Sequence, residues 1–79
     1  MDKDQQVIKA FLEEKVEWCK HQDSILEEIE SKLYEMKSLA EYARVHQLTS
    51  NEVKSLNEQL NSLAFEVYSL EQQLQSQIH

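Results

Sequence analysis

One cysteine and three histidines are the residues of this chain best suited to metal or redox chemistry. Cys19 and His21 lie two positions apart, and His79 comes near them only if the two halves of the chain pair antiparallel. A structural zinc site needs about four ligands in a rigid enclosure, whereas a lone cysteine on an apolar stripe is more often a small core residue. We therefore predict no metal site and no cofactor.

Adjacent carboxylates are the other candidates for chemistry, as in Glu13 beside Glu14 and Glu27 beside Glu28. On a helix, consecutive side chains point to different faces, so neither pair can share a proton in one pocket. Glu28 has Lys32 four residues on, which is the spacing of a solvated ion pair. The sequence contains no catalytic motif, and we predict no catalytic residues and no enzymatic activity.

The net charge of the chain limits the kinds of molecule that we expect it to bind. The chain has 79 residues, with 15 acids against 8 bases and a formal charge of −7, which repels nucleic-acid phosphates and anionic lipid headgroups. Its apolar runs are far shorter than the 20 or so residues that a membrane span requires, and its first residues do not resemble a signal peptide. We expect a cytoplasmic protein that binds neither nucleic acid nor membrane.

The second half of the chain predicts a helix over residues 50–78. Its apolar residues alternate in steps of three and four, the a/d pattern of a coiled-coil seam. Thr49 and Glu52 have the spacing of a capping box at the start of this helix, and Leu48 and Val53 have that of a hydrophobic staple. The predicted seam consists of Val53, Leu56, Leu60, Leu63, Val67, Leu70 and Leu74.

The first half predicts a longer helix, over residues 2–46. It ends where Arg44 and His46 suit the negative end of a helix dipole, and the turn at 46–49 is short enough to make the two helices antiparallel. Its apolar stripe spans an arc of about 140°, wider than a two-stranded seam. The stripe comprises Val7, Ile8, Phe11, Leu12, Trp18, Cys19, Ile25, Leu26, Ile29, Leu33, Met36, Ala40 and Ala43.

A break near residues 20–24 is the alternative. This stretch is wholly polar, Lys15 and Gln22 interrupt the stripe, and Ser24 and Glu27 could form a second capping box; a break there would give a three-helix bundle. A continuous helix is favoured because the stripe keeps its phase across the stretch and the chain has no glycine or proline. We predict an all-α, single-domain antiparallel hairpin over residues 1–79 that dimerises into a four-helix bundle.

Unequal helix lengths give the functional prediction. A helix of about 45 residues is roughly 67 Å long and one of about 29 residues roughly 43 Å, so the first 17 or so residues have no neighbour within their own chain. A small apolar ridge also faces outward on the second helix. The predicted partner or self-association residues are Val7, Ile8, Phe11, Leu12, Val16, Trp18, Phe65 and Tyr68.

These features predict a protein–protein interaction module. The expected protein is a small coiled-coil adaptor or regulator that forms homodimers, binds the helix of another protein, or does both. The alternative is a structural role as a coiled-coil spacer, scaffold or filament subunit, in which contacts between projecting helix ends propagate instead of closing.

Overall fold

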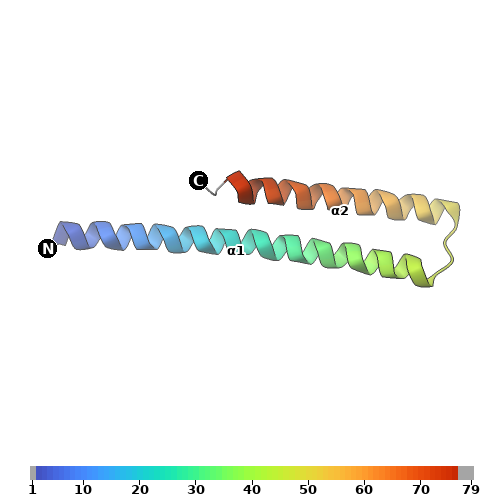
Figure 1. Cartoon of the computed structure of the whole chain (residues 1–79), viewed down its shortest axis with the longest axis horizontal. Helices are drawn as coiled ribbons and strands as arrows, with labels where there is room; N and C mark the ends of the chain where they lie inside the picture. The colour runs from blue at the N-terminus through green and yellow to red at the C-terminus, as the bar shows by residue number, and fades with distance from the viewer. Residues whose placement is uncertain (1, 77–79) are drawn as a thin grey trace.

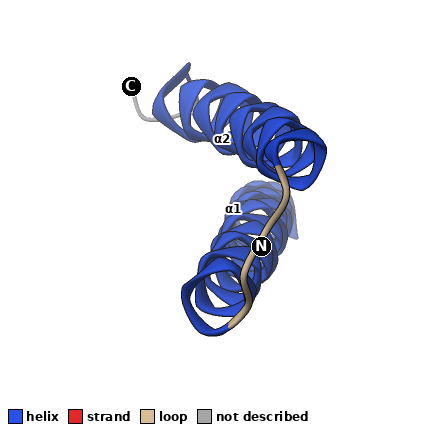
Figure 2. Ribbon diagram, turned by 90° about the vertical axis from the view of Figure 1, so that its right-hand side faces the viewer, coloured by secondary structure: helices blue, strands red, loops and turns tan. Residues whose placement is uncertain are grey.

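Two long helices make up an elongated antiparallel hairpin (Figure 1). The computed structural model describes residues 2–76, in which α1 covers Asp2–Val45 and α2 covers Ser50–Ser76. The hairpin measures 71 × 19 × 13 Å, and an end-on view shows one helix lying beside the other (Figure 2). The predicted helices and turn are confirmed, except that the predicted end at residue 78 lies outside the described residues.

α1 is a single unbroken helix, so the three-helix alternative is wrong. The polar stretch at residues 20–24 remains helical because no glycine or proline interrupts it. Gln22, in the middle of this stretch, and Ile25, directly after it, are both buried. Ser24 and Glu27 therefore lie inside the helix, and their capping-box spacing has no structural consequence.

The start of α2 is capped as the sequence predicts. The Thr49 amide donates to Glu52 Oε1 at 2.9 Å, and the Glu52 amide donates to Thr49 Oγ1 at 3.2 Å. These two bonds satisfy donors that have no partner within a helix. These contacts lower the pKa of the Glu52 carboxyl. The largest cause is the hydrogen bond from the Thr49 backbone amide, and the next is the hydrogen bond with the Thr49 hydroxyl.

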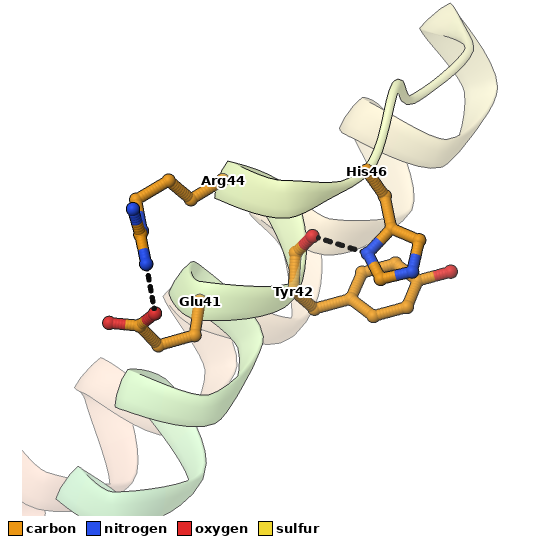
Figure 3. Close-up of polar contacts among 4 residues, drawn as sticks. All are labelled: Glu41, Tyr42, Arg44 and His46. Carbon is orange, nitrogen blue, oxygen red and sulfur yellow. Dashed lines mark hydrogen bonds and ion pairs between the residues drawn. The ribbon is translucent and has the colours of Figure 1, made fainter.

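The end of α1 is closed by a histidine instead of a glycine (Figure 3). His46 Nδ1 donates to the Tyr42 carbonyl oxygen at 2.9 Å, and the His46 amide donates to the same oxygen at 3.1 Å. The two rings stack with centroids 4.0 Å apart. Arg44, in the last turn, pairs with Glu41 at 3.1 Å. The His46 side chain thus bonds a carbonyl in the last turn of α1, where a left-handed glycine commonly ends a helix.

The hydrophobic core is a single narrow seam between the helices. Ile25, Leu63, Val67 and Leu70 are its buried apolar residues within the described chain. On α1 the residues that face α2 recur in steps of three and four, as in a coiled coil. They are Gln22, Ile25, Ile29, Lys32, Met36, Leu39 and Ala43 on α1, and Leu56, Leu60, Leu63, Val67, Leu70 and Leu74 on α2.

The prediction that Val53 belongs to this seam is wrong, because its side chain is 42% exposed. Leu48, from the turn, instead lines the groove at this end of the hairpin together with Leu39 and Leu56. The chain therefore closes the last layer of its core with a turn residue, and Val53 is displaced to the surface.

An ion pair across the helices marks their register. Lys32 Nζ lies 3.5 Å from Glu66 Oε2, and antiparallel helices advance at the same 1.5 Å per residue in opposite directions. Ten residues beyond this pair, Ser76 at the end of α2 therefore lies level with Gln22 of α1. Every residue from 3 to 21 is exposed, and this stretch lies beyond the described end of α2; it is slightly longer than the predicted 17 residues.

Candidate protein–protein interface

The overhang, defined as residues 3–21 of α1, extends past the described end of α2 (Figure 1). It contains six of the predicted association residues, and their side chains are between 43% and 68% exposed. They lie on one continuous helix and so keep fixed positions relative to one another. The six residues are Val7, Ile8, Phe11, Leu12, Val16 and Trp18.

The overhang has two adjoining apolar faces. At 100° per residue, Phe11 and Trp18 continue the face that α1 presents to α2 further along. Ile8, Leu12 and Val16 are rotated about 110° from it and line a shallow groove whose rim carries charged residues. Together the two faces span about half of the helix circumference. An apolar surface of that width fits two neighbouring helices better than one.

Charged residues border these faces without covering them. Lys15 Nζ lies 5.2 Å from the centroid of the Phe11 ring, a cation–π contact worth about 0.5–1 kcal/mol at an exposed site. Lys20 pairs with Glu17 at 3.9 Å, and both side chains are largely exposed. The apolar surface with a charged rim has the arrangement of a protein–protein interface.

A second apolar row runs along one side of α1, and we call it the lateral ridge. Its members are spaced seven residues apart, the repeat of a left-handed coiled coil. Leu26 and Leu33 on this ridge remain 48% and 50% exposed, although α2 lies beside them. The ridge is formed by Leu12, Cys19, Leu26, Leu33 and Ala40.

Sequence reasoning assigned the lateral ridge to the same stripe as the seam, and the structure separates them. The seam uses one edge of the wide arc, through residues such as Ile25 and Ile29, and leaves the other edge open. Cys19, expected to be a small core residue, is exposed as part of the open edge. The signal that could have separated the two was the strict seven-residue spacing of the ridge.

The two sides of the hairpin carry different surface features. On one side a groove between the helices has a mixed lining of Tyr34, Glu35, Ser38 and Leu39 of α1 and Gln59, Ser62 and Leu63 of α2. The lateral ridge lies on the opposite side of the seam, because its residues are rotated from the seam in the opposite sense. Tyr68, on α2, is rotated toward the ridge side and is exposed there.

The two predicted association residues of α2 lie apart from the overhang. Phe65 is 70% exposed and points away from α1, and Tyr68 is also exposed. From the register set by Glu66, Phe65 lies level with Leu33 of α1, well outside residues 3–21. The structure thus places the eight predicted residues in two separate surfaces.

A buried amide marks the boundary between the overhang and the hairpin. Gln22 is only 7% exposed, and neither its Oε1 nor its Nε2 has a hydrogen-bond partner among residues 2–76. An unpaired buried polar group costs about 1–3 kcal/mol. A polar residue at an a-type position can restrict register and oligomeric state at a cost in stability.

No protein-family model, characterised protein or solved structure matches this chain. Within residues 2–76, no three His, Cys, Asp or Glu side chains are grouped closely enough to hold a metal ion, and His79 lies outside this range. Neither of the described helices is long and apolar enough to span a bilayer. The functional argument therefore depends on the geometry of the exposed apolar surfaces.

Proposed function

We propose that this chain is a non-enzymatic protein–protein interaction module that self-associates through its overhang and offers an apolar helix face to helical partners. The observation that carries the proposal is the overhang itself. It is a helix with large apolar side chains on about half of its circumference and no neighbouring helix within the described chain. Contiguous exposed apolar surface with a polar rim is typical of association sites.

The free energy of the isolated hairpin supports association. A single small core in a chain of this size rarely supplies more than about 3–5 kcal/mol, and here the described core has four buried apolar residues. Complete burial of one large apolar side chain contributes about 1.5–3 kcal/mol. Covering the half-exposed side chains of the overhang would therefore add stability comparable to that of the hairpin core.

The acidic charge supports a helical protein as the partner, in preference to nucleic acid or an anionic membrane. With 15 acids and 8 bases, the surface repels phosphate groups. An amphipathic helix needs only a complementary apolar face, and such helix-in-groove contacts recur in adaptors and regulators. A cytoplasmic location, a homodimer and a helical partner are accordingly parts of this proposal.

Sedimentation equilibrium over a range of concentrations tests self-association. We compare the unaltered chain with Phe11→Asp in the overhang and with the control Tyr34→Asp. Each variant places one carboxylate at an exposed aromatic position of α1, but Tyr34 lies outside both the overhang and the lateral ridge. We expect a dimer for the unaltered chain and for Tyr34→Asp, and mainly monomer for Phe11→Asp.

Circular dichroism of the same samples separates loss of association from loss of helix. The proposal is supported if Phe11→Asp keeps the helical content of a hairpin and sediments as a monomer. A strictly monomeric unaltered chain with a fully helical overhang contradicts it, as does an equal effect of the two substitutions.

The alternative is a structural role as a coiled-coil spacer, scaffold or filament subunit. It differs from the interaction module in whether the assembly stops at a fixed number of copies. A two-fold dimer stops at two copies, whereas head-to-tail contacts between overhangs form filaments. The favouring observation is the elongated shape, 71 Å long, with the overhang at one end. Light scattering that keeps rising with concentration would favour this alternative over a closed dimer.

The outward pair on α2 supports a second docking surface for a partner helix. Phe65 and Tyr68 are three residues apart and both are exposed, so they are neighbours on the helix surface. Phe65→Asp should weaken assembly with that partner and leave helicity intact. An unchanged affinity would identify Phe65 as an ordinary exposed aromatic residue.

A further inference from the structure

We propose that the second copy packs antiparallel along the lateral ridge of α1, with the two-fold axis beside Leu26. This inference depends on the self-association proposed above and specifies its interface, orientation and register. In this dimer Leu26 meets Leu26 of the second copy, Leu12 meets Ala40, and Cys19 meets Leu33. The ridge supplies a contact line of four heptads, about 42 Å long.

Side-chain volumes favour the antiparallel orientation. About the Leu26 axis, each small ridge residue, Cys19 or Ala40, faces a leucine, so the sizes interlock as in a well-packed core. A parallel, in-register pair would put Cys19 against Cys19 and Ala40 against Ala40. Those two small-residue layers would leave gaps. The observed order of large and small residues therefore matches the antiparallel arrangement.

Charge favours the same orientation. Residues 1–21 carry four cations and five acids, a formal charge of −1, whereas residues 22–79 carry four cations and ten acids, a formal charge of −6. An antiparallel pair places each nearly neutral overhang beside the acidic hairpin of the other copy. A parallel pair places the two acidic hairpins side by side, which costs free energy through like-charge repulsion.

The antiparallel dimer also covers both faces of the overhang. About the Leu26 axis, residues 3–21 lie beside residues 31–49 of the second copy, where its α2 is also present. The face of the overhang with Ile8, Leu12 and Val16 then packs on the second α1. The face with Phe11 and Trp18, which continues the seam, adjoins the second α2. The half-circumference apolar surface of the overhang thus gains the two neighbours that its width requires.

Disulfide cross-linking tests the position of the two-fold axis and the antiparallel orientation. Three single-cysteine chains are compared under mild oxidation: the unaltered chain with Cys19, and Leu26→Cys and Leu33→Cys, each combined with Cys19→Ser. A disulfide needs Cα atoms about 4.4–6.8 Å apart. In the proposed dimer the two copies of residue 26 adjoin, while the copies of residue 19, and likewise of residue 33, are 14 residues apart along the axis, about 21 Å.

We expect covalent dimer from Leu26→Cys alone, with Cys19 and Leu33→Cys remaining at least tenfold less cross-linked. Cross-linking of all three chains would show a parallel dimer and overturn the inference, while the proposed self-association would stand. If the chain sediments as a dimer but Leu26→Cys does not cross-link, the assignment of the lateral ridge as the interface, or of its register, would be overturned. A monomer by sedimentation for the unaltered chain would overturn self-association itself, so the two failures are distinguishable.

Discussion

Leu26→Ala is the substitution that most directly links the exposed surface of the hairpin to its assembly. Leu26 is the central residue of the lateral ridge, and its side chain is 48% exposed in the single chain. The rest of the same chain, α1 and α2 together, therefore covers about half of this residue, and a partner could cover the other half. Truncation to alanine removes three carbon atoms, which correspond to about 2.4 kcal/mol of transfer free energy on complete burial.

The expected effect on the dimer follows from this division. About half of that transfer free energy, roughly 1.2 kcal/mol per copy, becomes available only on association. Because both copies carry the substitution at the two-fold axis, the dimer loses about 2.4 kcal/mol, which corresponds to roughly a fifty-fold increase in the dissociation constant. The single chain should lose at most about 1.2 kcal/mol, because α1 itself supplies part of the cover of Leu26.

Sedimentation equilibrium measures the dissociation constant, and thermal unfolding followed by circular dichroism at low concentration measures the stability of the single chain. Tyr34→Ala serves as the matched control, because Tyr34 is 70% exposed and lies off the ridge. A dissociation constant that stays within about twofold of the unaltered chain, with hairpin stability lowered as expected, would refute the assignment of Leu26 to the interface. An equal increase for Tyr34→Ala would also refute it, since the effect would then be nonspecific.

The remaining predictions concern the cap and the buried amide. Thr49→Ala should lower the free energy of unfolding by about 1 kcal/mol, because it removes the acceptor for a helix-start amide; guanidinium unfolding measures this, and no change would contradict a role for the cap. The pKa of Glu52 is lowered from 4.5 by hydrogen bonds from Thr49, so its contribution to stability is present above its unfolded-state pKa and is lost as the pH falls through the folded-state value. Glu52→Gln should therefore remove part of the acid sensitivity, which a pH series of thermal unfolding curves would detect. Gln22→Leu should raise stability by about 1 kcal/mol or more, because the buried amide lacks a partner within residues 2–76; a lower melting temperature would indicate that the amide is satisfied in the assembled protein.

Local interactions explain which parts of the fold could be predicted. The capping box at Thr49 and Glu52 involves residues three apart, and its two hydrogen bonds form as the spacing predicts. The continuity of α1 follows from the unbroken apolar phase and the absence of glycine and proline. The seam of α2 from Leu56 to Leu74 was likewise predictable, because a strict a/d alternation specifies one face of a helix.

The division of the α1 stripe could not be predicted in the same way. Ile25 and Leu26 are adjacent apolar residues of similar volume, yet Ile25 is buried and Leu26 is half exposed. The part of the apolar arc that α2 covers decides between them, and that depends on how the two helices pack against each other. Val53 was misplaced for a similar reason, since the position of Leu48 depends on the path of the turn.

The sequence alone determined the helices, the turn and the unequal lengths, because helical periodicity, capping and the absence of helix breakers act within a few residues of one another. It also determined that the apolar residues of the overhang exceed what the hairpin can cover. The tertiary structure decided which edge of α1 packs against α2 and which edge stays open as the lateral ridge. That choice depends on the register and rotation of two helices whose contacting residues are far apart in the chain, and no local pattern specifies it.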